Sequence, residues 1–83
     1  MAEDLKTLDA DLVVDARGQL CPLPVLAASK NIGRVPVGGV LEIQATDAGA
    51  ASDIRAWARR AGHEHLGLLQ QSGYLRVFVR RRA

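Results

Sequence analysis

Alternating hydrophobic and polar residues predict most of the strands in this protein. The run VLEIQAT at 40–46 alternates with the period of two that is typical of a half-buried strand. Two further alternating runs, LGLLQQ at 66–71 and YLRVFVRR at 74–81, are joined by a Ser-Gly pair that suits a tight hairpin. A short β-branched run, LVVD at 12–15, predicts another strand at the beginning of the fold.

Two stretches between these strands repeat their apolar residues with the period of an α-helix. The first extends from Pro22 to about Gly33 and has one mildly apolar face. The second follows Asp47, which we expect to be its N-cap, and ends at Gly62, a typical C-terminal stop. Pro36 and the glycine pair that follows separate the first helix from the next strand.

The predicted order of elements is therefore β-α-β-α-β-β. A chain of 83 residues is long enough for one domain with one hydrophobic core. We expect an α/β (α+β) two-layer sandwich in which a mixed four-stranded sheet carries both helices on one face. Residues 1–11 are expected to be a flexible or loosely ordered N-terminal segment, and residues 12–83 a single domain.

Composition narrows the class of protein. Hydrophobic residues make up 48% of the chain and charged residues 24%, as in an ordinary soluble domain. No stretch predicts a membrane span, and the acidic N-terminus lacks the features of a signal peptide, so we expect a cytoplasmic protein that does not associate with membranes. The single cysteine fits a reducing compartment, because it has no partner for an internal disulfide.

That cysteine, Cys21, stands at the predicted start of the first helix. If Pro22 is the first helical residue, it and Pro24 lie in the first turn, where a missing N–H costs no intrahelical hydrogen bond. Cys21 is then the predicted N-cap, where the positive end of the helix dipole lowers the pKa of a thiol. Arg17, four residues upstream, is expected to add positive charge. Cys21 is thus a candidate nucleophile, although a structural cysteine is the alternative interpretation.

Other chemistries of a lone cysteine fit the sequence less well. Dithiol exchange of the C-x-x-C type would require a second cysteine at the position of Pro24. A cysteine hydrolase needs a nearby general base, and the only histidines, His63 and His65, follow the second helix. These histidines and Cys21 do not have the spacing of a metal site, so we expect neither a metal nor a cofactor. The remaining interpretation is that the Cys21 thiol accepts a group from one protein and passes it to another.

The motif CPLP at 21–24 is the most specific feature of the sequence. It is accompanied by Asp15, Gly18, Gly39, Asp47, Asp53, Trp57 and the pair Gly62-His63. With these residues the chain, from about Leu12 to Arg81, resembles the TusA/SirA-like sulfur carrier family, in which a C-P-x-P motif opens the first helix. The resemblance implies the β-α-β-α-β-β fold and a sulfurtransferase that acts as a protein-to-protein carrier.

In that family the cysteine carries sulfane sulfur as a persulfide, which the resemblance assigns to Cys21. The sulfur would come from a cysteine desulfurase or a rhodanese-like donor and pass to an acceptor protein. Uses in the family include tRNA thiolation, molybdenum cofactor maturation and sulfur oxidation. Leu23 replaces an acid of the best-known tRNA-thiolation carriers, and Ala48 stands where a proline often follows the aspartate. The supporting residues of the site would be Arg17, Gly18, Pro22, Leu23, Pro24 and Asp47.

Two other functions stay open from the residues alone. The last strand turns Arg76, Phe78 and Arg80 away from the helices, which is compatible with a regulatory module that binds RNA or a protein. A lone exposed cysteine also permits a redox-sensing thiol. Direct nucleic-acid binding is not favoured, because a single aromatic residue lies among these arginines, and we expect a monomer.

Overall fold

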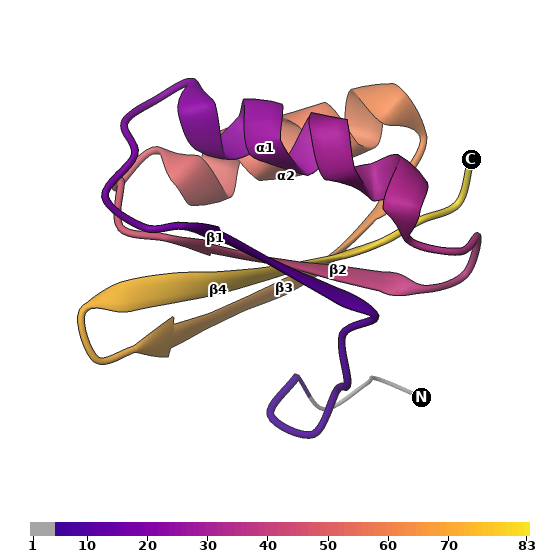
Figure 1. Ribbon diagram of the computed structural model, residues 1–83, viewed down its shortest axis with the longest axis horizontal. Coiled ribbons are helices and arrows are strands. Elements are labelled where there is room, and N and C mark those ends of the chain that lie inside the picture. Colours follow the sequence, from indigo (N-terminus) through magenta and orange to yellow (C-terminus); the bar gives the residue numbers. More distant parts are fainter. Residues whose placement is uncertain (1–4) are drawn as a thin grey trace.

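A four-stranded sheet with both helices on one face forms the computed structural model of the protein, which describes residues 5–83 (Figure 1). The strands are β1 (Leu12–Ala16), β2 (Val40–Ala45), β3 (Glu64–Gln71) and β4 (Tyr74–Arg80). The helices are α1 (Leu23–Asn31), the short 3-10 helix η1 (Ile32–Arg34) and α2 (Ala50–Ala61). The order of elements and the two-layer arrangement confirm the predicted fold class.

The strands lie in the order β1-β2-β4-β3 across the sheet. β1 is parallel to β2, whereas β4 is antiparallel to both of its neighbours, β2 and β3. The helices α1 and α2 connect β1 to β2 and β2 to β3, so the chain starts each helix at the same end of the sheet. This topology brings the start of α1 and the start of α2 together.

The core lies between the helices and the sheet. It consists of Ala16, Ala28, Val35, Leu41, Ile43, Ala45, Ala50, Ile54, Ala58, Val77 and Val79. Full burial of each larger aliphatic side chain contributes roughly 1.5–3 kcal/mol, which favours this packed layer. On β4, Val77 and Val79 are fully buried and Leu75 packs partly buried against them, as the alternation in the sequence predicted.

The third strand begins earlier than the predicted range of 66–71. Its ladder with β4 starts where Glu64 pairs with Arg80, and the register shifts between His65 and Gly67. A bulge inserts an extra residue and therefore interrupts the alternation on which the prediction relied. The other strands differ from their predicted bounds by a single residue at one end.

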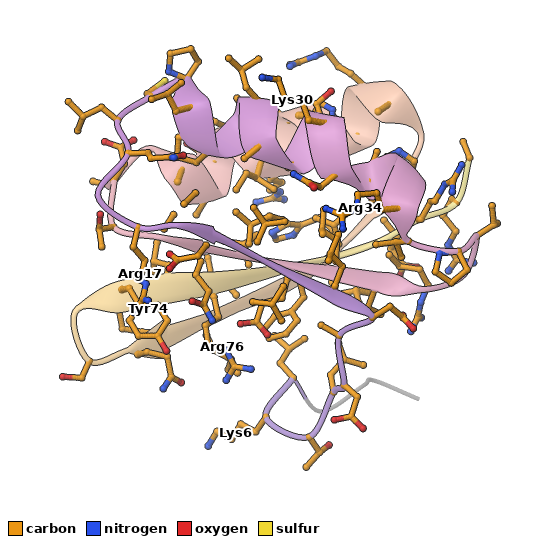
Figure 2. All side chains as sticks on the ribbon, viewed as in Figure 1. Lys6, Arg17, Lys30, Arg34, Tyr74 and Arg76 are labelled. Carbon is orange, nitrogen blue, oxygen red and sulfur yellow. The ribbon has the colours of Figure 1, made fainter. Side chains whose placement is uncertain are left out.

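The sheet face opposite the helices carries an ion pair between Arg76, which is labelled in Figure 2, and Glu42. Glu42 is almost fully buried and accepts hydrogen bonds from Arg76 Nε and Nη2, at 3.0 and 3.1 Å, and from Gln44 Nε2 at 2.9 Å. The Arg76 guanidinium lies 5.2 Å from the centroid of the Phe78 ring, which is fully buried. Phe78 is therefore no platform for stacking bases, and the hypothesis that it binds RNA together with Arg76 and Arg80 is wrong on this point.

Residues 5–11 lie on this same side of the sheet (Figure 1). Leu5 packs on β3 so closely that a Cβ atom at Gly67 would lie 2.8 Å from Leu5 Cδ1. Asp11 is tied to β2, because its N–H donates to the Val40 carbonyl at 2.8 Å and its Oδ2 accepts from the Val40 N–H at 2.7 Å. Residues 1–4 of the predicted loosely ordered segment lie outside the described residues, and how loosely 1–11 is held stays a prediction. Within 5–83, no helix is long and apolar enough to cross a membrane.

Candidate functional site

Cys21 lies exposed on a turn directly before α1. The Leu23 N–H donates to the Leu20 carbonyl at 2.8 Å, so Cys21 and Pro22 are the central residues of this turn, and the peptide bond between them is cis. The first helical hydrogen bond ends on the Pro22 carbonyl, which makes Pro22 the N-cap and Pro24 the second helical residue. The prediction that Cys21 caps the helix is therefore wrong, because the turn uses both residues before α1 begins.

Three exposed leucines lie close to Cys21 in the chain. Leu20 is 71% exposed, Leu23 49% and Leu26 45%. Pro24, by contrast, is fully buried and fixes the start of α1 on the core. Exposed apolar side chains that gather beside one reactive group are typical of a protein-docking surface. We call Leu20, Leu23 and Leu26 the apolar rim.

The thiol hydrogen bonds to a carboxylate of the second helix. Cys21 Sγ lies 3.0 Å from Asp53 Oδ2 and donates to it. This hydrogen bond raises the pKa of the Cys21 thiol, and burial together with the negative charges of Asp53 and Asp47 raises it further. The predicted lowering of this pKa is thus wrong, because the carboxylates stabilise the protonated thiol and Cys21 is not at the helix cap.

A groove of about 240 Å³ opens beside the thiol. Its lining consists of Cys21, Pro22, Val25, Asp53, Ala56 and Arg60. We call it the thiol groove. Because one wall comes from the start of α1 and the other from α2, the groove exists only once the helices have packed together. Its open shape leaves the sulfur accessible to a second protein.

Gly18 and Asp47 shape the two loops that lead to these helices. Gly18 has a positive φ of 80° and donates its N–H to Thr46 Oγ1 at 2.9 Å, which joins the loop before α1 to the end of β2. Asp47 is not the N-cap of α2, since its carbonyl accepts from the Ala50 N–H at 3.1 Å and closes a turn. Gly49 is the N-cap instead, so α2 begins later than predicted.

Arg17 is held by an acidic neighbour and an aromatic ring (Figure 2). Its Nε and Nη2 donate to the two carboxylate oxygens of Asp15 at 2.9 and 3.0 Å, and its guanidinium lies 5.1 Å from the centroid of the Tyr74 ring. These hydrogen bonds lower the pKa of Asp15 to about 2. The expectation that Arg17 supplies positive charge to the thiol is not met, because Asp15 compensates that charge.

Sequence reasoning matched Asp53 to the family pattern but did not identify it as the partner of the thiol. The two residues are 32 positions apart, and no local pattern connects them. His63 and His65 lie away from the thiol groove and line another cavity with Arg55 and Arg59. Within residues 5–83, no group of three or more His, Cys, Asp and Glu side chains converges on a metal position.

Comparison with known proteins places the chain in a family. Residues 12–81 match the family described as sulfurtransferase TusA. YrkF of Bacillus subtilis is 42% identical over 74 residues, which cover 89% of this chain but 40% of YrkF, so the chain spans less than half of that relative. The sulfur carrier protein TusA of Allochromatium vinosum is 34% identical over 73 residues, which cover 88% of this chain and 96% of that protein.

A solved structure agrees with the fold. The crystal structure of a SirA-like protein from Desulfitobacterium hafniense superposes with a TM-score of 0.75 over 87% of this chain and 99% of that one, at 24% sequence identity. At this identity the likeness shows the fold, whereas the family rests on the sequence matches over most of the chain. The protein belongs to the TusA family of sulfurtransferases.

Proposed function

We propose that the protein carries sulfane sulfur as a persulfide on Cys21 and relays it between two partner proteins. The observation that carries this proposal is the exposed Cys21 sulfur at the open thiol groove, 3.0 Å from the Asp53 carboxylate. An exposed sulfur can be reached by the persulfide of a donor and later by the nucleophile of an acceptor. The open groove suits transfer between proteins better than it suits a reaction on an enclosed small substrate.

In the loading step, the Cys21 sulfur attacks the terminal sulfur of a donor persulfide. A bond forms between Cys21 Sγ and that sulfur, the S–S bond of the donor breaks, and the donor leaves as a thiolate with the electron pair. The sulfur keeps its oxidation state, so the exchange needs no added oxidant or reductant. Asp53 Oδ2 is placed to accept the proton of the Cys21 thiol, and the donor thiolate is protonated in turn.

Unloading follows the same chemistry in the opposite direction. A nucleophile of the acceptor attacks the terminal sulfur of the Cys21 persulfide, the S–S bond breaks, and Cys21 leaves as a thiolate. The Cys21 thiolate takes up the proton that the acceptor nucleophile releases, with the Asp53 carboxylate placed to relay it. The hydrogen bond seen in the structure then forms again, and the carrier is ready for another cycle.

Docking of both partners would use the apolar rim. Leu20 and Leu23 are the end residues of the turn that carries the thiol, and Leu26 follows within α1; burial of their exposed surface favours association. The donor would be a cysteine desulfurase or a rhodanese-like protein, and the acceptor a protein of tRNA thiolation, molybdenum cofactor maturation or sulfur oxidation. We place this relay in the cytoplasm, where a reducing environment keeps a lone thiol free.

Mass spectrometry of the intact protein tests the proposal. The protein is incubated with a cysteine desulfurase and cysteine, or with a rhodanese and thiosulfate, and weighed without reductant. We expect the mass to increase by one sulfur atom, and the increase to disappear after treatment with dithiothreitol. The Cys21→Ser variant should gain no mass, because a hydroxyl does not accept sulfane sulfur.

Two results would contradict this function. Absence of the mass gain with both donors would exclude loading on this chain, and an equal gain in Cys21→Ser would exclude Cys21 as the carrier. A disulfide-linked dimer as the main product, in place of the persulfide, would point to the redox-sensing alternative.

A further inference from the structure

A second cavity lies on the other flank of α2 and is lined by basic side chains. Its volume is about 540 Å³, and its lining consists of Arg55, Arg59, Gly62, His63 and His65. We call it the basic cavity. The 3.6-residue period of α2 separates it from the thiol groove: positions 55 and 59 line the basic cavity, whereas 56 and 60 line the groove. No acidic residue belongs to its lining.

The two arginines of the basic cavity lack counter-charges. Among residues 5–83, Arg17, Arg76 and Arg82 each pair with a carboxylate, but the side chains of Arg55 and Arg59 make no ion pair or hydrogen bond there. Both belong to the same exposed face of α2, one helical turn apart, so their guanidinium groups border the same cavity. This wall therefore offers several N–H donors and no acceptor.

The histidines on the opposite wall also have unused nitrogen atoms. His65 Nε2 is buried and has no hydrogen-bond partner in the described chain, although buried polar atoms in folded proteins nearly always have one. His63 Nδ1 accepts the Arg82 N–H at 3.1 Å, so the neutral ring carries its proton on Nε2. A ligand with acceptor oxygens in the cavity would accept a hydrogen bond from Nε2 of the His63 ring.

The charges around these histidines point to the same kind of ligand. Burial lowers the pKa of His63 and His65, and the neighbouring cations Arg81 and Arg55 lower these values further. Glu64, which stands between the two histidines in the chain, is paired with Arg82. The cavity thus gathers positive charges that repel one another, and an anion would relieve this repulsion.

We propose that the basic cavity binds the doubly charged oxyanion group of a small molecule, of the phosphate or sulfate type. The planar guanidinium of arginine matches the oxygen atoms of such a group in a bidentate manner, which a monovalent spherical anion cannot provide. The cavity volume is in the range of small-molecule sites, so there is room for the rest of a small metabolite. The site is separate from Cys21 and does not depend on sulfur transfer.

NMR titration tests this proposal in the Cys21→Ser variant, in which thiosulfate cannot react with the thiol. The imidazole signals of His63 and His65 are followed while inorganic phosphate, sulfate or thiosulfate replaces chloride at constant ionic strength. We expect saturable shifts in the millimolar range and a higher pKa of both histidines with the oxyanion, because a bound anion favours the imidazolium form. Acetate serves as a singly charged control and should produce weaker shifts.

Variants on α2 show whether the arginines carry the binding. Arg55→Gln together with Arg59→Gln should weaken oxyanion binding at least tenfold. Arg60→Gln is the control, because it removes a positive charge from the same helix at a residue that lines the thiol groove. This variant should retain most of the oxyanion binding. Near-UV circular dichroism of Trp57 confirms that each variant is folded. Equal shifts with chloride and oxyanions, or unchanged affinity in the double variant, would overturn the proposal. Single-stranded RNA that binds more tightly than every small anion would assign the cavity to a nucleic acid instead.

Discussion

Glu42 and Asp53 are carboxylates that accept side-chain hydrogen bonds in two regions of the molecule, and their partners differ in charge. On the sheet face opposite the helices, Glu42 is nearly buried and is held by the cation of Arg76. In the thiol groove, Asp53 faces the neutral thiol of Cys21. A carboxylate with a cation stabilises the fold, whereas a carboxylate with a thiol controls the protonation of a reactive group.

The same two pairs shift pKa values in ways that reflect these roles. Burial acts to raise the pKa of Glu42, but the hydrogen bonds from Arg76 and Gln44 outweigh it, so the pKa is lowered. In the groove, the hydrogen bond to Asp53 raises the pKa of Cys21 and keeps the sulfur protonated while no partner is bound. A protonated thiol resists accidental oxidation, which suits a carrier that waits for its donor.

The largest effect is expected from Glu42→Ala. The substitution leaves the Arg76 guanidinium without its acceptor on a largely buried face, and we expect the free energy of unfolding to fall by about 2 kcal/mol. Urea denaturation followed by circular dichroism measures this change. Glu64→Ala is the matched control, because it removes an equivalent but exposed partner from Arg82 and should have a small effect. Equal losses in both variants would contradict the role of burial.

The pH dependence of stability tests the same pair. Since the pKa of Glu42 is lowered in the folded state, its ionised form stabilises the fold above the ordinary value of 4.5, and this contribution is lost as the pH falls through the lowered value. Glu42→Gln should therefore lose part of the acid-dependent decrease in stability. Denaturation midpoints between neutral and acidic pH measure it, and an unchanged pH profile would argue against the pair.

A smaller, kinetic effect is expected from Asp53→Asn. Removal of the carboxylate lowers the pKa of the Cys21 thiol, so more thiolate is present near neutral pH and alkylation by iodoacetamide becomes several-fold faster. The lower basicity of the sulfur offsets only part of this gain. The pH profile of the alkylation rate gives the pKa directly. Asp47→Asn should shift it in the same direction but less, because Asp47 acts only through its charge.

An unchanged or higher pKa in Asp53→Asn would show that the carboxylate does not control the thiol. Persulfide loading provides a second readout in the same variant. If Asp53 accepts the thiol proton during loading, the variant should react faster with iodoacetamide. Its rate of sulfur transfer from a donor should increase less, because the proton acceptor is missing. A purely structural role of Asp53 would change both rates in parallel.

The smallest effect is expected from Arg17→Ala. Asp15 and Arg17 form the same kind of pair as Glu42 and Arg76, but both side chains are about half exposed. We expect the pKa of Asp15 to rise from about 2 toward 3.8, while stability at neutral pH hardly changes. NMR titration of the Asp15 carboxyl group measures this shift. A loss of stability as large as that of Glu42→Ala would remove the distinction between exposed and buried pairs.

Most of the fold could be predicted because it follows from local patterns. Alternation placed β2 and β4 within one residue of their bounds, and Gly62, with a φ of 81°, ends α2 as expected of a left-handed glycine. The start of β3 could not be predicted, since a bulge breaks its alternation. The alternation of β4 places Phe78 on the sheet face away from the helices. Its burial there could not be predicted, because it depends on what packs against that face.

The candidate site could be predicted only in part. The position of Cys21 before α1 followed from its neighbouring prolines, although the turn of Leu20 to Leu23 displaced it from the cap. The direction of its pKa shift could not be predicted, because the helix dipole was weighed without the carboxylate of Asp53. Its role as sulfur carrier stays a prediction until persulfide loading is measured.

Local sequence set the order of strands and helices in this protein and the placement of its thiol at a helix start, since periodicity, prolines and glycines act over a few residues. Packing of α1 against α2 joined Cys21 to Asp53 across 32 positions and so reversed the expected pKa shift. Packing of α2 beside β3 likewise assembled the basic cavity from Arg55, Arg59 and two histidines. Contacts of this kind depend on how two elements pack against each other, and the periodicity of a single helix or strand does not predict that packing.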